Sequence, residues 1–383
     1  MRLPDIQNDF VNWYSVPYCQ ISEDDRKKYQ LEKGDICIAR TGASTGTNYT
    51  VKDDVDAVFA SYLIRYKIDK AVADPFYIGF LLKSPKWREH VMSIIGGSAQ
   101  PGANAKQFAR FEFPLPPFSE QRAIAKILSD LDEKIELNHR MNKTLEAIAQ
   151  AIFKRWFVDF KFSDEKGNPY KDSGGRMINS ELGEIPMGWA VKNIEDIVIV
   201  KGGATPSTKE SKFWEGGDIF WCTPKDLSQL ASPVLLDTER KITKTGLQSI
   251  SSGLLEKGTL LLSSRAPIGY LAISEIPVSI NQGFIAMLCD KRVSNYFMYF
   301  WTKQNLVRIK NMANGSTFQE INKTNFRKIK IIVPLESALK EFDHISAGLW
   351  GAIVTNEKQS RELIQIRDSL LPKLMSGKIR AKS

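Results

Sequence analysis

The sequence predicts an α+β fold in which one unit occurs twice, each copy being a mixed α/β globular domain followed by a long helix. Three observations predict it: a residue pattern that recurs at a fixed offset, short β-type runs in the first part of each copy, and apolar residues three and four positions apart in the second part. With 383 residues, the chain is long enough for two units that each bury a core. A pseudo-two-fold axis between the copies would pair the two long helices as an antiparallel coiled coil.

The repeat has no gap at the end of each copy, where identical residues lie 218 positions apart. The pairs are Gly97 and Gly315, Asn104 and Asn322, Phe108 and Phe326, Pro116 and Pro334, Asn138 and Asn356, and Leu145 and Leu363. Upstream, residues 31–34 match residues 255–258 at an offset of 224, and Asp5 matches Asp226 at an offset of 221. A repeat of this length indicates two copies of one domain rather than a solenoid of short units.

The first part of each copy, residues 1–113 and 188–332, contains short apolar runs separated by turn residues, a pattern that is typical of β-strands. Strands are predicted at residues 36–39, 260–262, 278–280 and 329–333. Short helices are predicted near residues 75–94 and 294–311. Together these elements indicate a mixed α/β domain.

The second part of each copy predicts a helix of about 40 residues, roughly 60 Å long at the usual helical rise. Ser119 provides a start signal for the first of these helices, since its hydroxyl can cap the first turn. A globular domain cannot bury a helix of this length, so we expect the two helices to pair along an apolar seam. The seam positions are Ile124, Leu128, Leu131, Ile135, Asn138, Leu145 and Ile152 in the first helix, and Phe342, Leu349, Ile353, Asn356, Leu363 and Leu370 in the second.

Polar residues interrupt this seam at equivalent places. Asn138 and Asn142 occupy positions where apolar residues are expected, and Asn356 and Ser360 are their counterparts. Polar seam residues cost stability but fix the register of paired helices. Alternatively, a local shift turns these side chains toward solvent.

These patterns divide the chain into five segments. They are a first globular domain at 1–116, a central helix at 117–160, a polar linker at 161–187, a second globular domain at 188–333 and a C-terminal helix at 334–378. Trp189 lies 66 residues before Leu255, whereas Met1 lies 30 residues before Leu31. The first domain is therefore expected to have no counterpart of roughly residues 188–220, either because the sequence starts at an internal methionine or because the domain is naturally shortened. Any edge strand in that segment would be missing.

Composition narrows the classes of partner. The formal net charge of +9 favours polyanions such as DNA or RNA, because binding releases their counterions. The four cysteines form no C-x-x-C pair and the three histidines are far apart, so neither a disulfide framework, a metal site nor a cofactor is expected. No apolar run reaches the roughly 20 residues that cross a bilayer, so we expect a cytoplasmic protein without a membrane partner.

Two similar domains held by paired helices would contact two patches of a duplex at a fixed separation. Loops at residues 40–48, 96–100 and 314–319 carry the side chains that such contacts use, since Arg, Asn and Gln bind base edges and Ser and Thr bind phosphates. The candidate DNA contacts are Arg40, Thr41, Ser44, Thr45, Asn48, Gln100, Lys106, Lys201, Thr205, Ser207, Lys209, Arg265, Ser316, Thr317, Gln319 and Lys323. Loops of this composition are also common as plain turns, and residues shared by the repeats, such as Gly97 and Gly315, are better framework candidates.

The run at residues 113–125 closely resembles the junction between a target-recognition domain and the conserved helix in specificity subunits of type I restriction–modification enzymes. Residues 182–189 are similar to the entry into such a domain, and residues 202–207 and 281–284, with Trp221 and Asp226, also match. The resemblance implies a non-catalytic subunit whose two target-recognition domains each read half of a bipartite double-stranded DNA site, with the helices fixing the gap. It also implies two modification subunits that methylate adenine with S-adenosylmethionine, and restriction subunits that translocate and cut DNA.

Other functions are less well supported. Residues 74–77 resemble the D-P-P-Y motif of adenine methyltransferases, but the equivalent residues 294–297 do not, and Asp74 is better explained as a helix cap. No phosphate-binding loop of the G-x-x-x-x-G-K-[ST] type occurs, which excludes a nucleotide-driven motor. A pure scaffold protein using its helices remains an alternative, and salt-sensitive DNA binding would distinguish the two.

Overall fold

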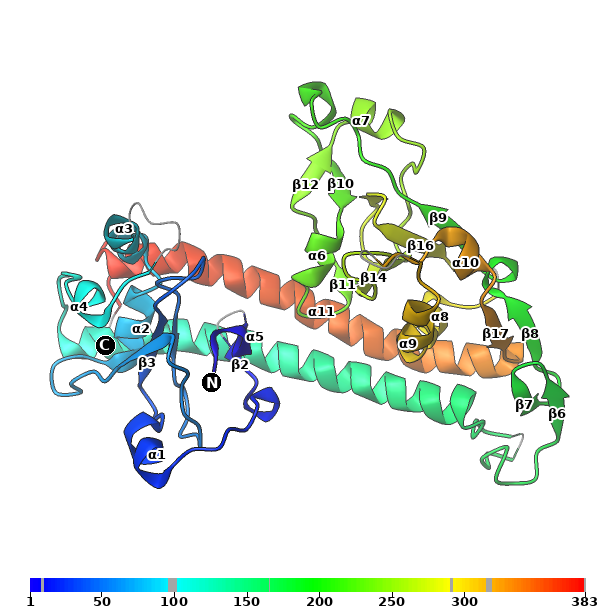
Figure 1. The fold of residues 1–383 in the computed structure, drawn as a ribbon, viewed down its shortest axis with the longest axis horizontal. Helices are drawn as coiled ribbons and strands as arrows, with labels where there is room; N and C mark the ends of the chain where they lie inside the picture. Colours follow the sequence, from blue (N-terminus) through cyan, green and yellow to red (C-terminus); the bar gives the residue numbers. More distant parts are fainter. Residues whose placement is uncertain (8–9, 96–101, 165, 290–291, 315–318, 382–383) are drawn as a thin grey trace. The chain divides into compact units, whose positions relative to one another are not determined.

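The computed structural model describes residues 1–7, 10–95, 102–164, 166–289, 292–314 and 319–381. The chain forms two compact units (Figure 1). Unit 1 comprises residues 1–137 and 360–383, and unit 2 comprises residues 138–359. Both units include part of each long helix, α5 (Phe118–Phe153) and α11 (Glu336–Met375).

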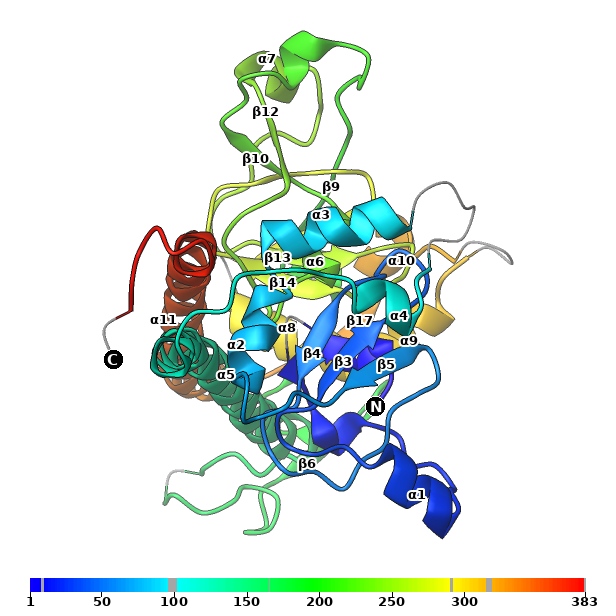
Figure 2. The same cartoon turned by 90° about the vertical axis from the view of Figure 1, so that its left-hand side faces the viewer.

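Unit 1 is built on a small antiparallel sheet with strand order β4-β3-β5. Before α5 its elements are η1 (Leu3–Asp5), β1 (Ile6–Gln7), β2 (Phe10–Val11), η2 (Trp13–Ser15), α1 (Glu23–Tyr29), β3 (Ile36–Ala39), β4 (Asn48–Thr50), β5 (Leu63–Tyr66), α2 (Pro75–Leu81), α3 (Pro85–Ile94) and α4 (Ala105–Phe108). Alternate residues of β3 point to opposite faces, so Ile36 and Ile38 join the core formed with α2 and the long helices, whereas Cys37 packs on the other face. Figure 2 shows α2 and α3 beside this sheet.

Unit 2 contains a larger sheet with strand order β11-β14-β13-β16-β9. Between the long helices its elements are η3 (Lys154–Val158), β6 (Met177–Ser180), β7 (Gly183–Pro186), β8 (Ala190–Asn193), η4 (Ile194–Asp196), β9 (Ile199–Gly202), η5 (Ser211–Phe213), β10 (Ile219–Cys222), α6 (Pro224–Ser228), β11 (Val234–Leu235), β12 (Arg240–Ile242), α7 (Lys244–Gln248), β13 (Leu260–Ser263), β14 (Leu271–Ser274), β15 (Ser279–Ile280), β16 (Phe284–Leu288), α8 (Asn295–Gln304), α9 (Leu306–Asn311), α10 (Lys323–Arg327) and β17 (Lys330–Val333). Three-stranded (β12-β10-β15) and two-stranded (β17-β8, β6-β7) sheets complete it.

The repeat seen in the sequence is also a repeat of structure. The three strands β14, β13 and β16 are ordered and paired as β4, β3 and β5 are. Helices α8 and α9 follow them as α2 and α3 follow in unit 1. Asn104 and Asn322 each cap the next short helix by accepting a backbone N–H three residues on. The predicted mixed fold, strands and short helices are confirmed.

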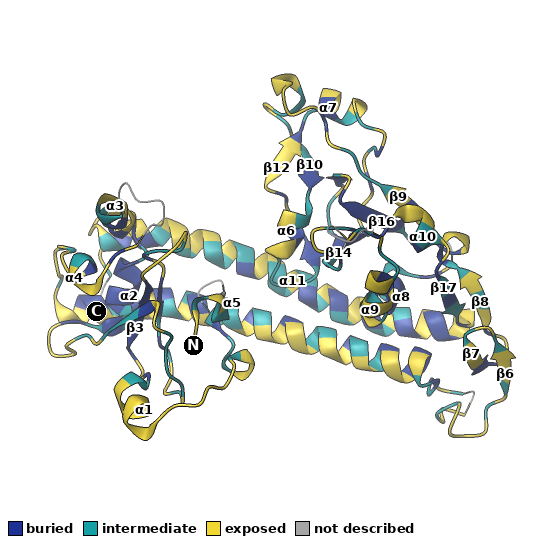
Figure 3. Cartoon of the chain, viewed as in Figure 1, coloured by how far each residue is buried: buried dark blue, intermediate teal, exposed yellow. Residues whose placement is uncertain are grey.

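Within each unit the two long helices contact one another and run antiparallel. In unit 1, Asp132 of α5 pairs with Arg367 of α11, and Leu128, earlier on α5, shares a core with Leu371, later on α11. In unit 2 the ring of Phe153 lies 5.9 Å from that of Phe342. Buried and exposed residues alternate along both helices (Figure 3), and every predicted seam residue is buried or half-buried. Supercoiling of the pair stays a prediction.

The polar seam residues of unit 2 face the partner helix. Asn138 is fully buried, and its amide donates to the Asn356 carbonyl at 3.3 Å and to Gln359 Oε1 at 3.0 Å. The Asn356 amide donates to Asn142 Oδ1 at 3.0 Å. The alternative in which these side chains turn to solvent is therefore wrong. Because each bond requires one alignment of the helices, the pattern agrees with a role in fixing register.

The segment expected to be a polar linker, residues 161–187, has more structure than its composition suggests. Strands β6 and β7 form a hairpin within it. The ring of Phe162 stacks on Tyr170 at 4.7 Å and on Trp189 at 5.0 Å between centroids. These aromatic residues attach the segment to the core of unit 2.

Candidate nucleic-acid interface

In unit 1 the predicted loop at residues 40–48 is joined at its base to residues 102–103, which follow the predicted loop at 96–100; that second loop lies outside the described residues. Thr41 forms an antiparallel bridge with Gly102, and the Ala103 amide donates to the Arg40 carbonyl at 2.9 Å. The first loop turns at Gly42, whose φ of 80° belongs to the left-handed region that favours glycine. The Thr45 hydroxyl donates to the Gly42 carbonyl at 2.7 Å and so holds this turn. The first loop is therefore held at its base by backbone pairing of Arg40 and Thr41 with residues 102–103.

Unit 2 builds the same arrangement with different side chains. Arg265 forms the equivalent bridge with Glu320, and the Ile321 amide donates to the Ser264 carbonyl at 3.1 Å. Thr41 thus corresponds to Arg265, and Gly102 corresponds to Glu320. The two units therefore share this construction and differ in the exposed groups that it presents.

The charges at this place in unit 2 are not equally available. The guanidinium of Arg265 lies 3.6 Å from the Glu320 carboxylate, which partly neutralises it. Lys323, in the first turn of α10, is exposed, and no carboxylate pairs with it among the described residues. A Cβ at Gly202 would lie 2.5 Å from Lys323 Nζ, so the ammonium rests directly over a glycine of β9. Lys323 is therefore the stronger candidate for a phosphate or base contact.

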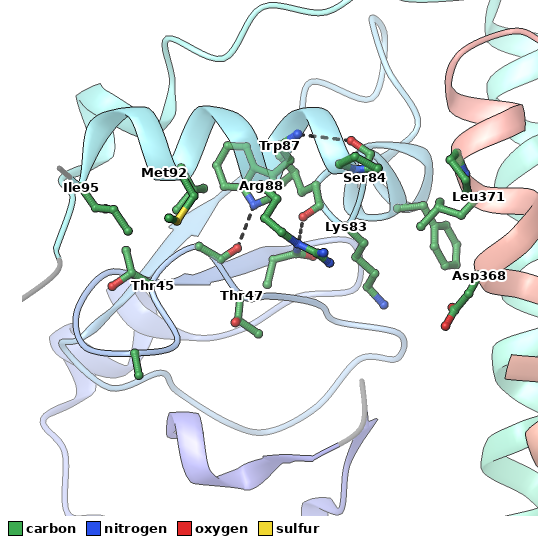
Figure 4. Close-up of a pocket in the computed structure, with 18 of the residues that line it drawn as sticks. Thr45, Thr47, Lys83, Ser84, Trp87, Arg88, Met92, Ile95, Asp368 and Leu371 are labelled. Atoms are coloured by element: carbon green, nitrogen blue, oxygen red, sulfur yellow. Dashed lines mark hydrogen bonds between the residues drawn. The ribbon is translucent and has the colours of Figure 1, made fainter. Parts of the chain in front are cut away.

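A cavity of about 670 Å³ lies beside the first loop of unit 1 (Figure 4). Residues 42–48, helix α3 and the last turns of α11 line it. Trp87 fixes the loop to α3, because its indole N–H donates to the Gly46 carbonyl at 2.8 Å. Arg88, Lys83 and Thr47 project toward the same part of the cavity. Arg88 is exposed and has no carboxylate partner within the described part of the chain.

Neither Lys83 nor Arg88 was among the sequence candidates, because both lie on or beside a helix that no motif marks. The structure places both residues around the same cavity as Thr45, which is one of the sequence candidates. Asn48 is a correction: its side chain is 3% exposed and its amide donates to the Leu82 carbonyl at 2.6 Å, so it holds β4 to α2 and is not available to DNA.

The remaining candidate DNA contacts fall into three groups: exposed residues, half-buried residues and residues outside the described part of the chain. Exposed residues are Arg40, Thr41, Lys106, Lys201, Thr205, Ser207, Lys209, Gln319 and Lys323. Half-buried residues are Ser44, Thr45 and Arg265. Gln100, Ser316 and Thr317 lie outside the described residues.

A second feature of unit 2 that the sequence did not reveal is a stacked arginine. The guanidinium of Arg240 lies 3.6 Å from the centroid of the Trp214 ring and 5.5 Å from that of Trp221. The indole N–H groups donate to the carbonyls of Ser207 and Ala204, which fixes both rings. In Figure 1 the part that carries β10, β12 and α7 projects from the rest of unit 2. Stacking orients the guanidinium and leaves its N–H donors for a planar acceptor such as a base edge or phosphate.

The alternative functions gain no support from the structure. The Asp74 carboxylate accepts hydrogen bonds from the backbone N–H groups of Phe76 and Tyr77, each at 3.0 Å. Asp74 therefore caps α2, as we predicted in place of a methyltransferase motif. Across the described ranges, no group of three His, Cys, Asp or Glu side chains is arranged to hold a metal ion. In the same part of the chain, every helix is too short or too polar to cross a membrane.

Comparison with known proteins gives the family. A family model described as the type I restriction modification DNA specificity domain matches residues 5–147 and 186–345. The chain belongs to this family. One match falls in each copy of the repeat: the first covers unit 1 up to residue 137 and continues along α5 to residue 147, and the second lies within unit 2.

The relatives agree with this assignment. The chain is 38% identical over 213 residues to the type I restriction enzyme MjaIX specificity subunit of Methanocaldococcus jannaschii, a match that covers 55% of this chain and 45% of that subunit. It is 24% identical over 420 residues to the HindI specificity subunit of Haemophilus influenzae, covering 94% of this chain and 91% of that one. The crystal structure of the type I restriction–modification S subunit from M. genitalium has the same fold, with a TM-score of 0.54 at 18% identity over 91% of this chain and 84% of that one.

Proposed function

We propose that this chain is the DNA-recognition subunit of a type I restriction–modification complex and has no catalytic activity itself. Each specificity domain reads one half of a bipartite double-stranded DNA site, and the paired helices set the gap between the halves. The helices also dock two modification subunits, which methylate adenine, and restriction subunits join the complex to cleave DNA.

One observation carries the proposal. Each unit places two loops together by the same backbone bridge, yet one bridge joins Thr41 to Gly102 and the other joins Arg265 to Glu320. Two readers of different half-sites must differ in their exposed groups while keeping the backbone that positions them, and the two units have this combination. Excess Lys and Arg, giving a net charge of +9, supports a polyanionic ligand. The stacked Arg240 and the exposed Lys323 supply donors of the kind that read bases and phosphates.

The test is long-read mapping of methylated adenine in cells that express this chain with a type I modification subunit encoded beside it. We expect methylation at a split motif with a fixed gap, present with the chain and absent without it. A strain expressing only the modification subunit is the control. Methylation that is the same in both strains would rule out the specificity role.

Within this proposal, Lys323→Ala is expected to weaken binding to the target duplex and to reduce the slope of log K against log salt by about one, as the loss of one phosphate contact does. The matched control is Arg265→Ala, which should have a smaller effect because Glu320 lies 3.6 Å from that guanidinium. Fluorescence anisotropy at several salt concentrations measures both. A loss at one half-site alone would identify a base contact, and equal effects of the two variants would contradict the assignment.

A further inference from the structure

Arg240 begins β12, the edge strand of the sheet β12-β10-β15 in unit 2. Its backbone is held from two sides, because it opposes Trp221 of β10 and the Thr238 hydroxyl donates to its carbonyl at 2.7 Å. The side chain is exposed, and no carboxylate pairs with it among the described residues. The adjacent Glu239 pairs with Lys225 at 2.7 Å instead. The guanidinium of Arg240 therefore keeps its charge for a ligand.

A tryptophan holds this guanidinium in one orientation. Its central carbon, Cζ, lies over the Trp214 ring at 3.6 Å from the centroid, which is the separation of a stacked pair. Trp214 is itself fixed, because its indole N–H donates to the Ser207 carbonyl at 3.0 Å and its ring meets that of the buried Trp221 edge-on at 5.0 Å. Stacking covers one face of the guanidinium and leaves the N–H donors at its rim.

A guanidinium fixed in this way suits a base edge better than a phosphate. Stacking confines the group to one plane, which a contact between charges does not need and two parallel hydrogen bonds do. In the major groove guanine presents two acceptors side by side, O6 and N7, whereas adenine presents one acceptor beside a donor, and cytosine and thymine offer no such pair. Because arginine has donors and no acceptor, guanine is the base that it matches.

The position of Arg240 in the fold also suits a groove of DNA. Strands β10 and β12 are antiparallel, and in both Figure 1 and Figure 2 they project from the rest of unit 2 with α7. The major groove is wide enough to admit a two-stranded ribbon. The next residue of β12, Lys241, lies on the opposite face, with Nζ 4.6 Å from the centroid of the Phe220 ring. One face of the ribbon thus carries the oriented arginine, and the other carries a lysine.

We propose that Arg240 reads a guanine in the half-site of unit 2, donating two hydrogen bonds to its O6 and N7 in the major groove. Trp214 is the positioning residue that presents the guanidinium. This inference rests on the proposed function, and it names a base and a residue that the proposed function leaves open.

The first test maps methylated adenine in cells that express the modification subunit with the wild-type chain, Arg240→Ala or Lys241→Ala. We expect Arg240→Ala to accept any base pair at one G·C position of one half-site, with the other half-site and the gap unchanged. Lys241→Ala, an exposed cation of the same strand, is the matched control and should keep the motif. Trp214→Ala should relax the same position, and Trp214→Phe, which can still stack, should retain the guanine.

These outcomes separate the inference from the proposed function. A wild-type chain that directs no split motif contradicts the proposed function. A split motif that Arg240→Ala leaves unchanged overturns the inference alone, whether methylation stays the same or falls equally at every site, as the loss of a phosphate contact would make it do. Relaxation of the same position by Lys241→Ala also overturns it.

The second test measures binding of the chain, assembled with its modification subunits, to a duplex of the mapped motif by fluorescence anisotropy. Replacing the guanine by 7-deazaguanine removes the N7 acceptor and should raise the Kd of the wild-type complex at least about fivefold. Hypoxanthine retains O6 and N7 and should leave the Kd unchanged. The complex with Arg240→Ala should bind the guanine and 7-deazaguanine duplexes equally. The same rise in Kd for the wild type and Arg240→Ala, or none for the wild type, would overturn the assignment.

Discussion

Phe153→Ala is expected to destabilise unit 2 by about 3–5 kcal/mol, the usual cost of removing a buried aromatic ring. Phe153 is 1% exposed and lies near the end of α5. Its ring centroid is 5.3 Å from that of Phe157, 5.5 Å from Phe297 and 5.9 Å from Phe342. These neighbours belong to the end of the first helix, to α8 and to α11, so one ring joins three segments. Removal of the ring leaves a cavity lined by helices rather than loops, so whole helices would have to move to close it.

The repeat provides the comparison for this variant. Leu371, located 218 positions after Phe153, is 9% exposed and packs in the core of unit 1. Leu371→Ala should cost about 2–5 kcal/mol, with the loss confined to unit 1. Hydrogen exchange followed by mass spectrometry resolves the two units, and urea unfolding gives the free energies. Equal loss of protection in both units for each variant, or a cost below about 1 kcal/mol, would contradict this account of the two cores.

The long helices and their contact face were predictable because helical periodicity is a local property of the sequence. Residues such as Ile124, Leu128 and Ile353 repeat at spacings that place them on one side of a helix, and the structure buries them. The internal repeat added long-range information that a single copy lacks. The repeat indicated that the segments after β3 and before α4 have counterparts after β13 and before α10. In each unit a backbone bridge joins the two segments, Thr41 to Gly102 in unit 1 and Arg265 to Glu320 in unit 2. The domain boundaries and the individual DNA contacts stay predictions.

The contacts that could not be predicted from the sequence join residues far apart in the chain. Asn48 has the composition of a loop residue, and only the placement of Leu82, 34 residues later, makes it an interior hydrogen-bond donor. The stack of Arg240 on Trp214 joins residues 26 positions apart, and no sequence pattern links these two residues. In the segment 161–187, Phe162 stacks on Tyr170 and also on Trp189, which lies just beyond the segment, and these contacts fold a stretch whose average composition is that of a linker. Average polarity conceals such contacts because a few large rings supply most of the buried area.

Asp132→Ala is expected to destabilise unit 1 by about 1.5–3 kcal/mol, because it removes the buried carboxylate that accepts from the Arg367 guanidinium and leaves the exposed Asp368, 2.9 Å away, beside that charge. The two side chains are 5% and 17% exposed, and they are joined at 2.8 Å between α5 and α11. Lys83 Nζ lies 3.9 Å from the same carboxylate, so the variant removes the acidic group shared by two cations. Urea unfolding followed by circular dichroism measures the loss. The control is Asp130→Ala, which removes an exposed carboxylate 2.7 Å from Lys126 on the same helix and should have no measurable effect.

A double variant separates the cost of removing Asp132 from beside the Arg367 guanidinium from the contribution of the Asp132–Arg367 ion pair itself. Asp132→Ala combined with Arg367→Met should recover much of the stability that Asp132→Ala loses, because the guanidinium that lost its buried partner Asp132 is gone and the methionine covers part of the apolar surface that the arginine stem covered. If the double variant is as unstable as Asp132→Ala, the pair itself holds the two helices together in unit 1. If it is as stable as the wild type, the pair adds little to stability, and its remaining physical role is to fix the register of α5 against α11, as the asparagine bonds do in unit 2.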